Sequence, residues 1–500
     1  MNNAISMNPN PVIQYLNKPA ENLTKEDLIR FIEDYDIQMI NFRYAGWDGR
    51  LKTLNFIIGN RDHLDSILTA GERVDGSSLF PFIEAGSSDL YVIPRYKTAF
   101  VNPFSEIPTL DILCSYYDRD GKPFEGAPEY ILKKAHNAFK EVTGYEFEAM
   151  GELEYYIISE DDGLFHADDQ RAYHESSPFS KWVDFRTEAM KLIAEAGGTI
   201  KYGHSEVGNF TKDGLVYEQN EIEFLPTNVE DAADQLLKAK WIVRTLAMQY
   251  GVEVTFAPKI TVGKAGSGLH IHTRIMKDGI NQMIKNGELS DVAKTAIAGY
   301  MELAPSLTAF GNMNPTSYFR LVPHQEAPTN ICWGDRNRSV LVRVPLGWTK
   351  PVNMISDANP QEKGDVVDFS GKQTVELRSP DGSADIYLLL AGMTVAARHG
   401  FEMKDALEVA KKTYVDINIF DEEHQEKQNS LAQLPKSCVE SAANLLKQKD
   451  IYLDRGVFTE AILNQLVKQL KAFEDTTLRH DIENDSKKIM EMVKKYFHCG

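Results

Sequence analysis

Charged and apolar residues alternate in five separate segments, and this alternation predicts β-strands that each carry one ionisable face. The segments contain Glu152 with Glu154, Glu221 with Glu223, His270 with His272, Arg343 alone, and Glu376 with Arg378. Alternate side chains of a strand share a face of the sheet, so each segment presents its charged groups together. One such segment is ordinarily a solvated face, but solvated faces mix Thr, Ser and Lys with Glu. Because Glu, His and Arg dominate here, we interpret the segments as parts of a functional site.

The pattern of apolar and polar residues in the first quarter of the chain predicts a small α+β unit. Residues 24–36 carry apolar side chains at helical spacing, and Thr24 with Asp27 forms a capping-box pair at their start. Two strand-like runs, Met39–Arg43 and Leu51–Phe56, follow and are joined by a turn that contains Asp-Gly. This arrangement predicts a β-hairpin behind the helix.

Longer elements follow. The pattern predicts a helix that opens at Pro128, a strand at Phe147–Ile158 and a helix from Val229 to Tyr250. The last hundred residues are amphipathic helical segments rich in Lys and Glu, which is typical of packing or subunit contact. We therefore divide the chain into three parts: a flexible N-terminal arm (residues 1–23), a small domain (24–115) and a larger domain with a helical tail (125–500).

Composition narrows the function classes. The 500 residues include 54 basic and 73 acidic side chains, for a formal net charge of −19. This charge disfavours binding to nucleic acid or to an anionic membrane. The longest nearly uninterrupted apolar run, Ile386–Ala397, is shorter than the ~20 residues of a membrane span. The N-terminal residues lack a secretory pattern and the four cysteines include no CxxC pair, so we expect a cytoplasmic protein.

The ionisable residues also indicate a reaction class. Carboxylates with one or two imidazoles are typical ligands of Mg²⁺ or Mn²⁺, whereas zinc favours more His or Cys. Guanidinium groups suit carboxylate and phosphate oxygens, and five arginines lie in one stretch: Arg320, Arg336, Arg338, Arg343 and Arg378. Together these groups indicate phosphoryl transfer. The sequence has no GxxxxGK[ST] motif and no complete dinucleotide fingerprint, so cations and arginines would hold a nucleotide.

Six ordered motifs resemble those of the glutamine synthetase family, the long prokaryotic type, over nearly the whole chain. They lie at Asp75–Ser78 (DGSS), Glu152–Glu154 (ELE), Gly266–His272 (GSGLHIH), Asn314–Pro328 (NPT to EAP), Asn337–Pro345 (NRS to RVP) and Glu376–Asp381 (ELRSPD). The resemblance implies an α+β fold, with an N-terminal β-grasp domain and a catalytic domain built on a curved antiparallel sheet with helices. It also implies a homododecamer of two hexameric rings, in which the neighbouring subunit supplies the DGSS loop to each active site.

The resemblance further implies a role for each site residue. Two Mg²⁺ or Mn²⁺ ions would lie on two ligand sets, one of Glu154, Glu206 and Glu221 and one of Glu152, His270 and Glu376. Glutamate would contact Gly266, Arg320, Glu326 and Arg378, and ATP would contact His272, Arg338 and Arg343. Ammonium would lie among Asp75, Ser78, Tyr173 and Glu206. The catalytic residues would be Asp75 as proton acceptor, Glu326 on a closing flap, and Arg338 facing the transferred group.

The sequence departs from the family pattern at several positions. Ala265 stands where the family has Asn, which removes a side-chain contact to the amino-acid substrate. Thr374 stands where the family has Arg. Glu206 and Glu221 are farther apart than is usual, and we expect residues 208–214 to absorb the extra length as a surface loop.

Three hypotheses about function follow. The leading one is ATP-dependent ligation of ammonia to L-glutamate, which gives L-glutamine, ADP and phosphate through γ-glutamyl phosphate. The second is γ-glutamylation of a larger amine or polyamine on the same scaffold; the retained acidic residues of the ammonium pocket favour ammonia. The third is a non-catalytic oligomeric relative, which the retention of all six expected cation ligands disfavours.

Overall fold

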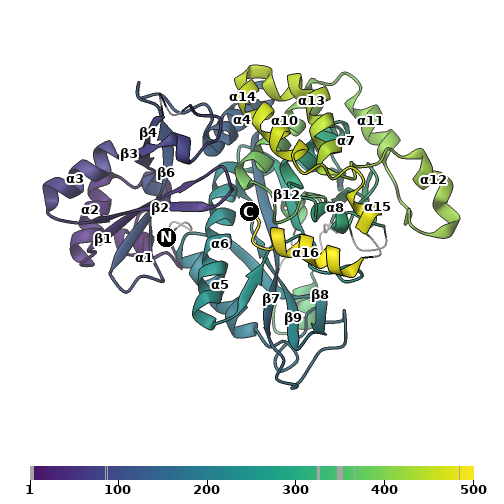
Figure 1. Cartoon of the computed structure of the whole chain (residues 1–500), viewed down its shortest axis with the longest axis horizontal. Coiled ribbons are helices and arrows are strands. Elements are labelled where there is room, and N and C mark those ends of the chain that lie inside the picture. Colours follow the sequence, from purple (N-terminus) through teal and green to yellow (C-terminus); the bar gives the residue numbers. More distant parts are fainter. Residues whose placement is uncertain are drawn as a thin grey trace.

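A small N-terminal domain lies beside a larger domain in the computed structural model of the chain (Figure 1). The structure describes residues 5–84, 86, 88–323, 327–345, 353–364, 366, 368–482 and 485–500. Within the described residues, no helix is both long enough and apolar enough to cross a membrane.

The N-terminal domain is built on a mixed sheet. Within the described residues its six strands have the order β2-β1-β6-β4-β3, with β5 beside β6. Its elements are α1 (Pro11–Leu16), α2 (Lys25–Asp34), β1 (Met39–Ala45), β2 (Leu51–Ile57), α3 (Arg61–Ala70), β3 (Glu72–Asp75), β4 (Asp89–Pro94), β5 (Phe100–Val101) and β6 (Thr109–Tyr117). The antiparallel pairing of β1 with β2 confirms the predicted hairpin. The capping box is also confirmed, because Thr24 and Asp27 each accept a hydrogen bond from the other's backbone N–H.

The structure corrects the prediction of a flexible arm. Helix α1 lies within that segment, and the Asn10 side chain caps it by accepting a hydrogen bond from the backbone N–H of Val12. Val12, Ile13 and Leu16 are buried in the core of the N-terminal domain. The polar residues around this short turn hide its apolar face in the sequence, and tertiary packing rather than intrinsic helix propensity holds it.

The larger domain contains a mostly antiparallel sheet that carries all five alternating segments. Within the described residues it has ten strands, with the main order β16-β17-β18-β12-β7-β9-β8. The strands are β7 (Glu146–Glu160), β8 (Ile200–Lys212), β9 (Leu215–Phe224), β10 (Thr227–Asn228), β11 (Glu253–Thr255), β12 (Leu269–Lys277), β13 (Ile280–Asn281), β16 (Trp333–Asp335), β17 (Val342–Val344) and β18 (Val375–Leu377). A separate hairpin pairs β14 (Ile284–Lys285) with β15 (Glu288–Leu289).

The register of this sheet sets charged residues opposite one another on neighbouring strands. The cross-strand partners are Glu152 with Glu223, Glu154 with Glu221, Glu152 with His270, His272 with Glu376, and Arg343 with Glu376. Directly opposed residues of two strands project from the same face of the sheet. The five segments therefore lie on adjacent strands and share one charged face, as the alternation predicts.

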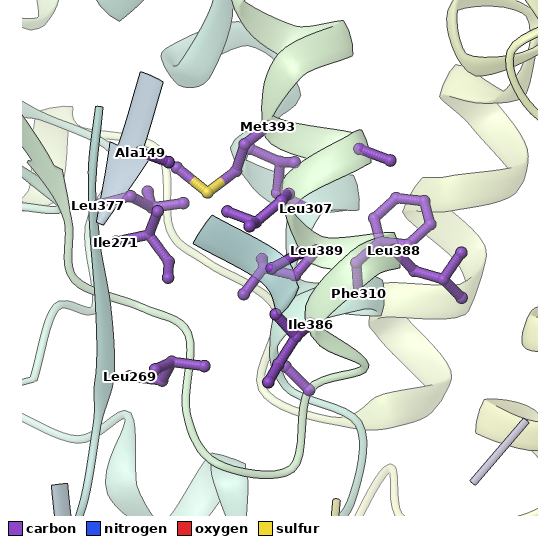
Figure 2. Close-up of a cluster of buried hydrophobic side chains, with 14 of the residues drawn as sticks. Ala149, Leu269, Ile271, Leu307, Phe310, Leu377, Ile386, Leu388, Leu389 and Met393 are labelled. Carbon is purple, nitrogen blue, oxygen red and sulfur yellow. The ribbon is translucent and has the colours of Figure 1, made fainter. Parts of the chain in front are cut away.

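The apolar residues between them face the helices. Figure 2 shows Ala149, Leu269, Ile271 and Leu377 of the sheet against Leu307, Phe310, Ile386, Leu389 and Met393 of α7 and α10. The helices of this part are α4 (Pro128–Thr143), α5 (Val183–Glu195), α6 (Val229–Tyr250), α7 (Asp291–Gly311), α8 (Ser317–Arg320), α9 (Met354–Ala358) and α10 (Ile386–Glu402). Because the apolar face is buried, the charged residues that alternate with it project from the opposite face of the sheet. A shift of one residue in strand register would exchange the two faces.

The last hundred residues are helical, as predicted. Their helices are α11 (Ala406–Thr413), α12 (Gln425–Ser430), α13 (Cys438–Leu453), α14 (Glu460–Lys471), α15 (Leu478–Ile482) and α16 (Ser486–Tyr496). Ile489 and Val493 of α16 pack with Tyr156 of β7 and Phe210 of β8. The tail therefore supports the edge of the sheet that carries β8 and β9.

A buried ion pair joins the two domains. Arg95, just after β4, donates to both carboxylate oxygens of Asp234 on α6, at 2.8 and 2.9 Å, and the Tyr387 hydroxyl donates to the same carboxylate at 2.6 Å. Burial opposes the charge of Asp234, but attraction to Arg95 holds its pKa below the usual value. Lys97 and Asp231 form a second pair in this interface, and both are more exposed.

We expect Arg95→Met to destabilise the chain by about 3 kcal/mol, because it leaves the Asp234 carboxylate buried without its partner. Lys97→Met is the matched control and should cost less than about 1 kcal/mol, as exposed pairs do. Urea unfolding at one fixed protein concentration measures both changes. Equal effects of the two substitutions would contradict this account of the interface.

Candidate active site

Ligand atoms from three strands converge at the centre of the charged face. Glu152 of β7, His270 of β12 and Glu376 of β18 each offer one atom within 4.8 Å of the others. His270 Nδ1 lies 2.9 Å from Glu152 Oε2 and 3.5 Å from Glu376 Oε1. The structure thus brings together the three residues expected to share one cation.

A second group lies on the hairpin of β8 and β9. His204, Glu206 and Glu221 offer ligand atoms within 4.8 Å of one another, and His204 Nε2 is 3.4 Å from Glu221 Oε1. Sequence reasoning found Glu206 and Glu221 but missed His204. Its signal was the same alternation, since His204 stands two positions before Glu206 on β8. Burial lowers the pKa of His204, which favours the neutral imidazole that binds metal ions.

Glu154, the third residue expected for this second cation, lies beside the group rather than within it. Its Oε2 atom accepts hydrogen bonds from the backbone N–H of Gly268 at 2.8 Å and from Gln219 Nε2 at 2.9 Å. Its Oε1 atom is 3.9 Å from His270 Nε2. Glu154 therefore stands between the two groups and also holds the glycine-containing loop that precedes β12.

A β-bulge accounts for the long spacing between Glu206 and Glu221. The register of β8 against β9 shifts between Ser205 and Asn209, and pairing then continues to Lys212. The predicted surface loop at 208–214 is therefore wrong, because most of the extra residues lengthen the hairpin. Bulges commonly redirect a side chain beside a functional site, and this one carries Glu206.

His272 lies against Glu152 at the far side of the cluster. Its Nε2 atom is 2.8 Å from Glu152 Oε1, and its Nδ1 atom is 2.9 Å from the hydroxyl of Thr374. Thr374, the position where the family has Arg, thus fixes the orientation of His272. Glu223 forms a third close group with Glu152 and His272. Lys201 Nζ lies 2.6 Å from Glu223 Oε1.

Neighbouring positive charge compensates the carboxylates of the first group, around Glu152, more than those of the second group, around Glu221. The pKa of Glu221 is raised well above its usual value by burial and by repulsion from Glu152 and Glu154. Burial also opposes the charge of Glu152, but His272 and His270 lower the pKa of that carboxyl well below its usual value. Buried carboxylates with an imidazole are suitable donors for Mg²⁺ or Mn²⁺, so the residues present fit two divalent cations.

Arginines surround the carboxylates on the side of β17 and β18. Arg343 Nη1 donates to Glu376 Oε2 and Arg378 Nε donates to Glu376 Oε1, each at 3.2 Å. Arg320 Nη2 lies 3.1 Å from His270 Nε2, and the backbone carbonyl groups of 379 and 380 accept from its other nitrogen. Arg336 differs from the rest, because it lines a separate cavity of about 760 Å³ with the apolar-face residue Val344.

A cavity of about 220 Å³ opens beside the cation groups. It is lined by Glu154, Gln170, Glu206, Val207, Gln219, Gly263, Lys264, Ala265, Gly266, His270, Arg320 and Arg378. The loop from Gly263 to Gly268 forms one wall. A Cβ atom at Gly266 would lie 2.4 Å from the carbonyl oxygen of Pro258, so only glycine fits there. Expected cation ligands and expected glutamate contacts therefore share one cavity.

Tyr173, which the resemblance places at the ammonium site, has aromatic neighbours. Tyr173 stacks on His174 with centroids 4.1 Å apart, meets His204 edge-on at 5.4 Å and hydrogen-bonds to Arg338, so it borders the second group. Glu326 lies outside the described residues.

The DGSS loop lies far from these residues within one chain. It begins at the last residue of β3 in the N-terminal domain, whereas β7, β8 and β9 belong to the larger domain and lie well away from β3 (Figure 1). Asp75 and Ser78 are therefore not brought to the carboxylates by this chain alone. Hydrogen bonds from Ser77 and Ser78 lower the pKa of Asp75 to about 2, so it is ionised at neutral pH.

Two family profiles match the chain. Residues 125–488 match the glutamine synthetase catalytic domain, and residues 36–119 match the glutamine synthetase beta-Grasp domain. The chain belongs to the glutamine synthetase family. Its fold class is accordingly the expected one, α+β with an N-terminal β-grasp domain and a catalytic domain built on a curled sheet.

Individual relatives agree. A glutamine synthetase of Clostridium saccharobutylicum is 30% identical over 439 residues, which cover 86% of this chain and 90% of the relative. One from Frankia alni is 31% identical over 415 residues, which cover 76% and 81%. Among solved structures, Plasmodium falciparum glutamine synthetase superposes with a TM-score of 0.74 at 19% identity, covering 93% of this chain and 99% of that one. A structure described as a GmaS/ADP complex gives 0.71 at 20% identity, covering 89% and 95%.

Cations should stabilise the protein more strongly at higher pH. Because the folded state raises the pKa of Glu221, its ionisation destabilises the cation-free protein as pH rises, and a bound Mg²⁺ relieves that repulsion. We expect Mg²⁺ to increase Tm more at pH 8 than at pH 6, measured by scanning fluorimetry. Glu221→Gln should raise Tm without Mg²⁺ and lose most of the Mg²⁺ effect.

Glu218→Gln is the matched control, because Glu218 is a half-buried carboxyl of β9 whose pKa burial also raises, and it lies outside the cation groups. This variant should keep the response of the unmodified protein. An equal Mg²⁺ effect in Glu221→Gln and in the unmodified protein would contradict the assignment.

Proposed function

We propose that this protein ligates ammonia to L-glutamate at the expense of ATP, forming L-glutamine, ADP and phosphate. The observation that carries the proposal is the arrangement of two carboxylate and imidazole groups beside a cavity that also contains Arg320 and Arg378. Sites of this kind promote phosphoryl transfer by positioning the reactants and neutralising charge. Membership of the glutamine synthetase family supports the same reaction.

The cavity suits an amino acid that carries a second carboxylate. Arg320 and Arg378 supply positive charge on one side, and Glu154 and Glu206 supply negative charge on another. In this proposal the arginines bind carboxylate oxygens of glutamate, and the carbonyl of Gly266 faces its ammonium group. The two divalent cations, when bound, neutralise the phosphate groups of ATP and polarise the phosphoryl group under attack.

The reaction itself needs two steps. A carboxylate is a poor acceptor for ammonia, so the γ-carboxylate first attacks the terminal phosphoryl group of ATP and becomes an acyl phosphate, with ADP as leaving group. Arg338 and Arg343 would stabilise the charge of the phosphoryl group in transit, and His272 would lie toward the nucleotide. Ammonia then displaces phosphate from the acyl carbon and leaves the amide.

The ammonium site in this proposal combines two chains. Asp75 and Ser78 would come from a neighbouring subunit and meet Glu206 and Tyr173, which border the second cation group. Ionised Asp75 attracts ammonium and accepts its proton, and Glu326 closes over the intermediate to exclude water. A homododecamer of two hexameric rings in the cytoplasm would provide these shared sites.

Phosphate release from Mg-ATP tests the proposal directly. We expect purified protein to release phosphate only with L-glutamate and ammonium present, matched one for one by glutamine that mass spectrometry identifies. The assay should include methylamine, other primary alkylamines and polyamines in place of ammonium, each at matched concentration.

Product formed only with an alkylamine or polyamine would contradict ammonia as the acceptor and favour the γ-glutamylation hypothesis. No turnover with any amine, from protein whose folding circular dichroism verifies, would favour the non-catalytic hypothesis. Glu376→Gln is the negative control, because it removes a carboxylate that contacts both His270 and Arg343.

A further inference from the structure

The loop from Gly263 to Gly268 is held in place by side chains from the strands β7 and β9 and from one connecting segment. The Tyr156 hydroxyl of β7 donates to the carbonyl of Ala265 at 2.8 Å, and Gln219 Nε2 of β9 donates to the carbonyl of Gly266 at 3.0 Å. A further contact comes from Gln170, whose Oε1 atom accepts a hydrogen bond from the backbone N–H of Ala265 at 2.7 Å. Gln170 belongs to the segment between β7 and α5.

Gln170 spans the gap between this loop and β8. Its Nε2 atom donates to the carbonyl of Asn209 at 2.9 Å, and its own backbone N–H donates to the same carbonyl at 3.0 Å. Asn209 Oδ1 accepts from the next backbone N–H, that of Arg171, at 3.0 Å. The backbone of Gln170 is left-handed, with φ of +58°, which costs energy for a residue with a side chain. Such strain persists where surrounding contacts impose it, and it is common at ligand sites.

The side chain of Gln170 also lines the cavity beside the cation groups. Its Oε1 atom is a carbonyl-type oxygen with capacity for two hydrogen bonds, and the backbone N–H of Ala265 occupies one of the two positions. Its Nε2 group points to Asn209, so the carboxamide is oriented with its oxygen toward the loop that forms one wall of the cavity.

An amino acid bound in this cavity needs hydrogen-bond acceptors for its α-ammonium group. Arg320 and Arg378 donate hydrogen bonds and cannot accept any, so they suit carboxylates and repel an ammonium group. Ala265, on the same wall, has no polar side chain. Gln170 is therefore the uncharged side chain on the loop side of the cavity that is placed to accept from an α-ammonium group, close to the carbonyl of Gly266.

We infer that Gln170 is a substrate-binding and specificity residue for the α-ammonium group of L-glutamate. Its carboxamide takes the place of the Asn side chain that the family carries at Ala265, while its bond to the Ala265 backbone sets the position of the loop. This inference rests on the proposed function, because it concerns the amino-acid subsite of that reaction.

Gln170→Met removes the acceptor oxygen and keeps a side chain of similar length. We expect KM for L-glutamate to rise about tenfold or more, as loss of a hydrogen bond to a charged group predicts, with KM for ATP and for ammonium within about twofold. Glutarate lacks the α-amino group, so its inhibition constant against L-glutamate should be the same in both proteins. If Gln170 had a merely structural role, its substitution would weaken the binding of glutarate and of L-glutamate alike.

Two further variants sharpen the test. The double variant Gln170→Met/Ala265→Asn restores a carboxamide on the loop and should recover most of the lost affinity for L-glutamate. Asp168→Ala is the matched control, because it alters an exposed residue of the same segment and should leave all three KM values unchanged. Should Gln170→Met fail to fold, Gln170→Ala takes its place, and the ratio of its affinity for L-glutamate to its affinity for glutarate is measured.

Unchanged KM for L-glutamate in Gln170→Met, or an equal loss for glutarate, would overturn the inference. Failure of the unmodified protein to convert glutamate overturns the proposed function instead. Isothermal titration of L-glutamate into both proteins with Mg²⁺ and ADP then tests Gln170 separately. Weaker binding to the variant supports the inference, and equal binding, or no binding to either protein, overturns it.

Discussion

Repulsion among buried carboxylates on one face of the sheet is the constraint on which the rest of this structure depends. Glu152 opposes Glu223 and Glu154 opposes Glu221 on adjacent strands, although like charges placed directly opposite destabilise a sheet. The packing of the other face against α7 and α10 holds these carboxylates opposite one another. A shift of one residue in register would bury their charges among Leu and Ile (Figure 2). The hydrophobic core thus maintains an electrostatic arrangement that would not form alone.

The surroundings relieve this repulsion in one half of the cluster and leave it in the other. His270, His272 and Arg343 approach the carboxylates of Glu152 and Glu376, and Lys201 approaches Glu223. Glu221 instead has carboxylates around it together with the imidazole of His204, whose lowered pKa favours the uncharged form, and burial and repulsion raise the pKa of Glu221. Cations would therefore contribute to folding as well as to chemistry in the β8–β9 half, since binding to the folded state alone stabilises it.

Local pattern predicted most of the scaffold and the centre of the site. Period-two alternation located the charged strands, and capping and helical spacing located α2, because each signal depends only on neighbouring residues. The bulge that carries Glu206 and the hairpin that replaced a predicted loop depend on pairing between β8 and β9, which spacing alone does not fix. Gln170 was missed because it lies in an irregular segment and acquires its role only through contacts with Asn209 and Ala265. Helix α1 was missed because its burial comes from tertiary packing.

The number and location of bound Mn²⁺ ions test the central claim most directly. Crystals of the protein grown with Mn²⁺, measured at the manganese absorption edge, should show two anomalous peaks per chain on the charged face. One should lie among Glu152, His270 and Glu376, and the other should lie beside Glu206 and Glu221. Peaks elsewhere, or a charged face without manganese while the protein is saturated with Mn²⁺, would contradict the account.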